Sequence, residues 1–122
     1  MKILILGDAS SIHVIKWVNA LLDKGNQIAV FSLRDYDGKS YSESPNLKIY
    51  SLGFDDSLFK LKVGAFEKLR YFKGLTQIKK IIKDFSPDVL HAHYASSYGM
   101  LGALSNFHPF VVSVWGSDVF EF

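Results

Sequence analysis

The stretch SPDVLHAHYASSYGMLGALSNFHPFVVSVWGSD, Ser86 to Asp118, decides the fold predicted for this 122-residue chain. Pro87 ends the preceding helix, because proline disfavours helical geometry in the residue before it. Asp88 to Tyr94 is short, apolar and flanked by turn formers, which is typical of a buried parallel strand. Ser96 or Ser97 can cap a helix that ends near Asn106, and Phe110 to Trp115 is a second apolar run. The stretch therefore predicts a strand, a helix and a second strand.

The same alternation runs through the first half of the chain. The elements expected there are a strand at Lys2 to Leu6, a helix at Ile12 to Lys24 ended by Gly25, and strands at Ile28 to Leu33 and Leu47 to Leu52. Strands that alternate with helix-length connections predict right-handed crossovers and a parallel sheet. We expect an α/β fold, a doubly wound, Rossmann-like sheet of about five strands in the order 3-2-1-4-5, with helices on both faces.

Ser57 to Phe85 is the basic part of the chain, with apolar residues at roughly helical spacing. Its basic residues are Lys60, Lys62, Lys68, Arg70, Lys73, Lys79, Lys80 and Lys83. Because the apolar positions change faces along the helix, we expect a break or bend near Gly74. Cationic and apolar side chains together are typical of interfacial helices, so Lys60 to Lys83 is a candidate contact with an anionic membrane surface. The alternative is an ordinary solvated helix on a sheet.

The composition is that of one globular domain, 48% hydrophobic and 21% charged. A net charge of +2 is too small to indicate a nucleic-acid partner. The chain has no cysteine, which excludes disulfides and thiolate metal sites. The apolar run Ile3 to Leu6 is too short for a signal-peptide core, and no stretch approaches the ~20 apolar residues of a membrane span. A cytoplasmic location is the expectation.

The first strand, turn and helix would carry the G-x-G-x-x-G motif in a dinucleotide-binding protein. Here only Gly7 fits that motif, because Ala9 and Ile12 occupy the other two glycine positions. A phosphate loop with Gly-Lys-Ser/Thr is also missing from the sequence. The turn therefore gives little support to an NAD-binding function.

Ligands of open parallel sheets bind outside the carboxyl ends of the strands, so any site should lie at that edge. His13 begins the first helix there, while His91 and His93 alternate along one strand and project to the same face. Two such histidines could share a metal, but no third ligand is obvious. We interpret His91 as a core histidine and His93, at the strand end, as a site candidate. The carboxylate of Asp118 can bind a sugar hydroxyl or act as a base, or it can cap a helix.

These motifs, in this order, resemble the N-terminal domain of retaining GT-B glycosyltransferases of the family-4 group. The resemblance rests on D-V-L-H-A-H-Y at 88–94, a Gly/Ala-rich helix, and P-F-V-V-S-V-W-G-S-D-V-F at 109–120, and it covers the whole chain. It implies transfer of a sugar from a nucleotide-sugar donor to a glycan or lipid-linked acceptor, without an obligatory metal or other cofactor. It also implies that residues 1–122 are the acceptor-side domain of a longer enzyme. The C-terminal nucleotide-sugar domain would be the partner of this domain, which alone would be inactive.

The same resemblance assigns the site residues, except Tyr94, which is predicted from its place at the carboxyl end of its strand. Asp118 and His93 are the predicted catalytic residues. The predicted substrate-binding residues are His13, Tyr94, Gly116 and Ser117. The chain departs from the family at two places, since Asp8-Ala9-Ser10 replaces the usual glycine pair of the first turn, and Trp115 stands where many members have histidine.

A phosphoacceptor receiver-like signalling domain is the alternative from another class. It needs an acidic cluster after the first strand, an aspartate after the third and a lysine after the fifth. Asp8 fits the first requirement, and Asp55 or Asp56 the second, but no lysine follows Val114. The glycosyltransferase is the favoured interpretation.

Overall fold

The computed structural model describes residues 1–33, 41–51, 63–94 and 97–114, with side chains left out for 63–71, and these residues form eight helices and strands. In chain order they are β1 (Lys2–Leu6), α1 (Ile12–Asp23), β2 (Gln27–Ser32), β3 (Leu47–Ser51), α2 (Val63–Phe85), β4 (Val89–His93), α3 (Ser97–Leu104) and β5 (Phe110–Ser113).

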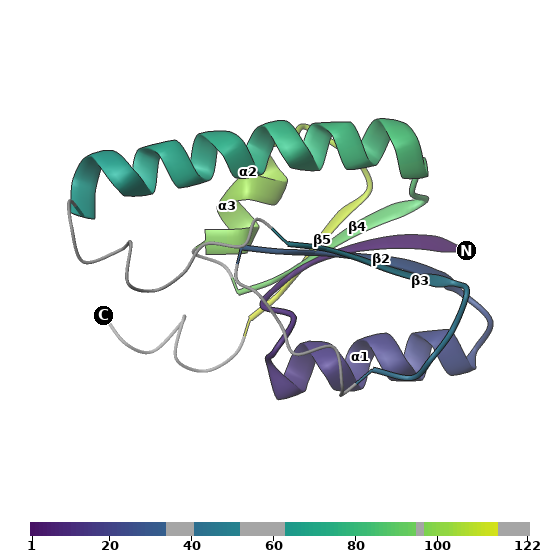
Figure 1. Ribbon diagram of the computed structural model, residues 1–122. Helices are drawn as coiled ribbons and strands as arrows, with labels where there is room; N and C mark the ends of the chain where they lie inside the picture. Colours follow the sequence, from purple (N-terminus) through teal and green to yellow (C-terminus); the bar gives the residue numbers. More distant parts are fainter. Residues whose placement is uncertain (34–40, 52–62, 95–96, 115–122) are drawn as a thin grey trace.

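The five strands form one parallel sheet in the order β3-β2-β1-β4-β5. The central strand β1 pairs with β2 on one side and β4 on the other, so that Leu4 lies opposite both Ala29 and Leu90. Figure 1 shows α1 against one face of the sheet and α2 and α3 against the other. The predicted fold class and strand order are confirmed.

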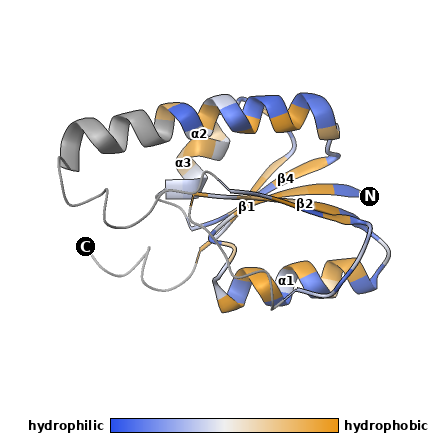
Figure 2. Ribbon diagram, in the orientation of Figure 1, coloured by the Kyte–Doolittle hydropathy of each residue, from blue (hydrophilic) through white to orange (hydrophobic). Residues whose placement is uncertain are grey.

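Two apolar cores hold the layers together, one on each face of the sheet. The core under α2 and α3 contains Leu4, Leu6, Phe31, Leu33, Ile78, Leu90 and Leu101, all fully buried. The core under α1 contains Ile3, Ile5, Val14, Val18, Ile28 and Val30. Figure 2 shows the corresponding concentration of hydrophobic residues along the central strands. Burial on both faces explains why these strands are almost continuously apolar in sequence.

The break expected near Gly74 is wrong, because α2 is one helix from Val63 to Phe85. Gly74, Ile78 and Ile81 are all buried and share one side of the helix. A Cβ atom at Gly74 would lie 3.3 Å from Cδ2 of Leu33 and 3.6 Å from Cδ1 of Leu101. The glycine thus allows the helix to pack closely on β2 and α3, and this contact offsets the roughly 1 kcal/mol that glycine costs in a helix.

The ends of the first and third helices follow the sequence signals only in part. Gly25 follows α1 with φ of 86°, the left-handed geometry predicted for it. Ser11 occupies the N-cap position of α1, but its side chain makes no capping hydrogen bond. In α3 the helix ends at Leu104, and Asn106 takes a positive φ of 58° in the turn that follows.

Candidate functional site

The carboxyl ends of β1, β4 and β5 lie side by side, because these strands are neighbours in the sheet (Figure 1). The described residues at this edge are the turn from Gly7 to Ser11, His93 and Tyr94 after β4, and Ser113 at the end of β5. The predicted site residues Gly116, Ser117 and Asp118 lie outside the described residues, so their positions stay predictions.

Hydrogen bonds to more distant parts of the chain fix the first turn. The backbone N–H of Ala9 donates to Oγ of Ser32 at 3.1 Å, and the hydroxyl of Tyr41 donates to the carbonyl oxygen of Ala9 at 2.6 Å. Within the turn, the N–H and the hydroxyl of Ser10 both donate to Oδ1 of Asp8, at 2.9 and 2.7 Å. The Asp8 carboxylate therefore orders this loop, which is the common role of aspartate in a tight turn.

Gly7 lets the first turn cross directly over His93. A Cβ atom at Gly7 would lie 2.8 Å from Cγ2 of Val14 and 3.5 Å from Cβ of His93. The backbone N–H of Gly7 donates to the carbonyl oxygen of Phe31 at 3.0 Å, which holds the glycine in line with the sheet. A side chain at this position would push the turn and α1 away from the end of β4.

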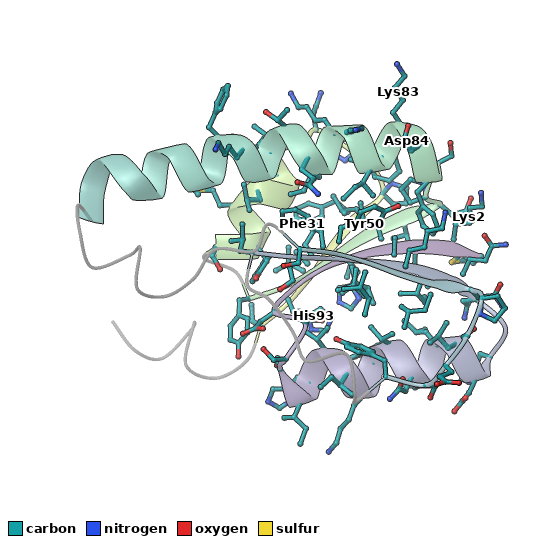
Figure 3. All side chains as sticks on the ribbon, in the orientation of Figure 1. Lys2, Phe31, Tyr50, Lys83, Asp84 and His93 are labelled. Carbon is teal, nitrogen blue, oxygen red and sulfur yellow. The ribbon has the colours of Figure 1, made fainter. Side chains whose placement is uncertain are left out.

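His93 lies in the layer between the sheet and α1, with no exposed surface (Figure 3). Burial is the main cause that lowers its pKa to about 4, and the charges of His91 and His13 lower it further. Its imidazole is therefore neutral at pH 7. The catalytic role predicted for His93 stays a prediction, and the buried ring favours support of the turn over direct contact with a substrate.

His91 is the core histidine predicted from its place in the strand. It is 8% exposed, and its Nε2 shares a hydrogen bond of 2.6 Å with Oγ of Ser113 on β5. Its ring centroid lies 4.6 Å from that of His93 and 5.4 Å from Trp17, which meets it edge-on. Burial lowers the pKa of His91 as well, so the two stacked rings avoid the repulsion of two like charges.

His13 and Tyr94 complete the described part of the edge. His13 is exposed in the first turn of α1, near enough for its charge to affect the pKa of His93, so the structure brings these two predicted residues together. Tyr94 has φ of 79°, and its carbonyl oxygen accepts a hydrogen bond from the N–H of Gly99 at 2.9 Å. This backbone conformation, uncommon for a residue with a side chain, turns the chain from β4 toward α3.

Two neighbours of the histidines were missed in the sequence. Trp17 lies four residues after His13, and residues four apart share one side of a helix. Ser113 lies opposite His93 in the β4–β5 register, so the alternation of β5 places it on the histidine face. Both could have been found from these spacings once the strand pairing was known.

Within the described ranges, no three histidine, aspartate or glutamate side chains are grouped closely enough to hold a metal ion. Of the helices that the structure describes, none has the length and apolar character needed to cross a membrane.

The parallel sheet, its helices on both faces and its polar carboxyl edge define a Rossmann-like α/β domain. Residues 2–122 match the family described as glycosyl transferase 4-like, so the chain belongs to this glycosyltransferase family. No curated protein sequence matches the chain. Family membership decides against the receiver-like alternative, and the Asp8 carboxylate that it required is bound within its own turn.

Proposed function

We propose that this chain is the acceptor-binding half of a retaining glycosyltransferase of polysaccharide biosynthesis. The full enzyme would move a sugar from a nucleotide-sugar donor to a glycan or lipid-linked acceptor, with the nucleotide held mainly by a C-terminal domain. The proposal includes a cytoplasmic location, peripheral at the inner face of the membrane. The observation that carries it is the carboxyl edge of the sheet, where exposed His13 lies beside buried, neutral His93 in a family of sugar transferases.

The exposed His13 suits a site that binds hydroxyl groups. The ring nitrogens of a histidine can form hydrogen bonds with a sugar hydroxyl. We assign His13 to contact with the acceptor, because its side chain is exposed at the edge. His93 lies under the Gly7 turn and keeps that turn in place, which makes it a positioning residue for His13. Gly116, Ser117 and Asp118 remain proposed site residues through the family resemblance, with Asp118 as the acid-base candidate. Tyr94 remains one through its place directly after β4.

The division between two domains rests on electrostatics. The leaving nucleoside diphosphate must be neutralised as the glycosidic bond breaks, and enzymes usually gain most of their rate enhancement from such charge stabilisation. The first turn here carries the Asp8 carboxylate, and the sequence has no Gly-Lys-Ser/Thr phosphate loop. We therefore expect the chain alone to bind acceptor weakly, to have little affinity for nucleotide sugars, and to release no nucleoside diphosphate.

The test is a titration of the purified 122-residue chain, with its histidine rings observed by NMR. We expect a panel of acceptor glycans to shift the ring signals of His13, while the exposed ring of His108, in the α3–β5 connection, serves as an internal control. His13→Ala should abolish glycan binding, and His108→Ala should leave it unchanged. Calorimetry with nucleotide sugars measures whether the same chain binds the donor. Tight nucleotide binding or measurable transfer by this chain would contradict the proposed division.

A further inference from the structure

A groove lies between α2 and the edge strand β3, on the face of the sheet opposite α1. Its volume is about 560 Å³, which is within the range of ligand sites in proteins. Tyr50 of β3 and the buried Ile81 of α2 form an apolar floor, and Phe72 forms part of the wall. Figure 3 shows Tyr50 between the sheet and α2. Phe72 is 69% exposed, which is unusual for a phenylalanine on a helix that packs against a core.

The groove has the length of a short β-strand. On the α2 side, polar residues spaced by three or four positions share one side of the helix and line the groove, namely Lys73, Gln77, Lys80 and Asp84. At a rise of 1.5 Å per residue, this row is about 16 Å long. The five residues of β3 span about 16 Å as well, at about 3.3 Å each. An extended segment of about five residues therefore fits between the strand and the helix.

β3 can pair with such a segment through its outer edge. Of the described strands, β2 is the one that lies next to it. The N–H of Ile28 in β2 donates to the carbonyl oxygen of Asn46, directly before β3, at 2.8 Å. Alternate residues of a strand bond to the same neighbour, so Lys48 and Tyr50 also face β2, and the N–H and the carbonyl oxygen of Ile49 point outward. A strand that pairs with these groups would continue the sheet.

The charges on the α2 side of the groove favour a carboxylate at one end. Lys73 and Lys80 line the groove together with the carboxylate of Asp84. Asp84 is four residues from Lys80 and eleven from Lys73, so it lies about 6 Å and about 16 Å away along the helix. The charge of Lys73 is therefore the less offset of the two, and a carboxylate on a bound segment is attracted most strongly to this lysine.

The other end of the groove combines charges of both signs. Lys2, Lys48 and Asp84 line a smaller hollow there, with a volume of about 160 Å³. The side chain of Lys2, in the central strand, also donates a hydrogen bond of 3.3 Å to the carbonyl oxygen of Phe85. Because α2 ends beside the amino ends of the strands, it runs antiparallel to β3, and Lys73 lies toward the carboxyl end of β3.

We propose that this groove binds an extended acidic peptide of a partner protein as an additional strand, antiparallel to β3. Antiparallel pairs are slightly more stable per residue than parallel ones. The peptide residue opposite Tyr50 is apolar and packs on the floor of the groove, because residues opposite each other share a face of the sheet. An acidic residue two positions before it points to the same face and meets Lys73. This inference does not depend on the acceptor site, which lies on the α1 face.

The experiment is binding of fluorescently labelled, terminally blocked peptides to the 122-residue chain, measured by anisotropy. The probe is Thr-Glu-Thr-Val-Thr-Thr-Thr, and a matched peptide has glutamine in place of glutamate. We expect the acidic probe to bind about fivefold more tightly, the effect of one ion pair at a surface. Lys73→Gln/Lys80→Gln should abolish this preference. Lys16→Gln/Lys24→Gln removes the same charge from exposed positions on the α1 side and should retain it.

N-methylation of the probe tests the strand pairing. With the valine opposite Tyr50, the N–H of the threonine that follows it faces the carbonyl oxygen of Ile49, whereas the N–H of the valine points away from β3. Methylation of that threonine nitrogen should weaken binding about tenfold, because it removes a main-chain hydrogen bond and blocks close approach. Methylation of the valine nitrogen should change binding by less than about twofold. Equal effects of the two methyl groups overturn the pairing with β3.

Phe72→Ser tests the apolar part of the groove, and Leu104→Ser of α3, at a side chain that is 54% exposed, is the control. We expect Phe72→Ser to weaken binding of the acidic probe about tenfold and Leu104→Ser to leave it unchanged. Both side chains are exposed, so circular dichroism should show unchanged folding. No binding of the probe at about 1 mM overturns the proposal. Equal loss of the acidic preference in the two lysine pairs, or equal weakening by the two serine variants, rejects binding in this groove.

Discussion

The two faces of the sheet differ in chemistry, and successive residues of β4 display the difference. Leu90 and Ala92 point into the core under α2 and α3, which the strands fill with apolar side chains. His91 and His93 point to the α1 face, where they stack on each other and meet Trp17. One strand thus stabilises the domain with one side and supports a polar edge with the other. Substitutions on the apolar face should therefore change stability alone, whereas substitutions at the histidines on the α1 face should also change how stability depends on pH.

The largest effect is expected for Leu90→Ala on the apolar face. Leu90 is fully buried between Leu4 of β1 and Phe110 of β5 in the register. Removal of its side chain should lower the free energy of unfolding by about 3–4 kcal/mol, through lost burial and a cavity. Urea unfolding at pH 7.5 measures this loss, and Leu104→Ala, at an exposed position, is the control. A loss below 1 kcal/mol would show that this face is less tightly packed than described.

A pH effect of up to about 3 kcal/mol is expected on the α1 face. The pKa of His93 falls to about 4 in the folded chain, so between pH 6.5 and 4 the unfolded chain binds a proton that the folded chain does not. Stability is therefore fully present above pH 6.5 and is lost as the pH falls toward 4. Urea unfolding across this range should show the loss, which His93→Gln should reduce and the exposed His108→Gln should not. If the pH profile of unfolding for His93→Gln runs parallel to that of the unchanged chain, the assignment of the pH effect to His93 is contradicted.

Gly7→Ala should cost about 1–3 kcal/mol, because its Cβ atom would collide with Val14 beneath the first turn. The double variant with Val14→Ala removes the colliding Cγ2 atom. We expect a favourable coupling of at least about 1 kcal/mol between the two substitutions in a double-mutant cycle. Simple additivity would mean that the turn relaxes without touching α1, and that the glycine is not needed for the crossing over His93.

The smallest effects compare single hydrogen bonds on the two faces. Ser113→Ala removes the partner of His91, and Tyr98→Phe removes the hydroxyl that accepts a hydrogen bond from the N–H of Leu33 at 3.1 Å. Each should cost about 1 kcal/mol at pH 7.5. Only Ser113→Ala should also move the histidine signals in NMR and change the pH profile of unfolding. Identical pH profiles for both variants would remove the distinction between the faces.

The sequence predicts the fold well because its signals are local. Short apolar runs separated by helix-length segments are sufficient to give five parallel strands, and Gly25 marks the end of α1 by its own geometry. The break in α2 was predicted wrongly because periodicity along one helix does not show which side meets the sheet. That side is defined by contacts of Gly74 with Leu33 and Leu101, which are distant in sequence.

The candidate site could be predicted only as far as strand ends determine it. His13 and His93 come together because β1 and β4 are neighbours, and this followed from the strand order. The bonds that fix the first turn come from Ser32 and Tyr41, polar residues with no distinctive local pattern. The degree of burial of His93 could not be predicted from the sequence either, because it depends on how closely the Gly7 turn passes over the ring.

The central place of β1 has a consequence for synthesis of the chain. Among the strands of this sheet, β1 comes first in the sequence and lies in the middle of the sheet. Its second partner, β4, begins directly after Asp88, whose carboxylate accepts a hydrogen bond from the N–H of Lys2 across 86 residues of sequence. At about 5–20 residues per second, the ribosome needs on the order of 10 s to supply that partner. During this interval one edge of an apolar strand is open to pairing with other chains. Folding of this domain is therefore sensitive to whatever shields the nascent β1–β2 pair until β4 emerges.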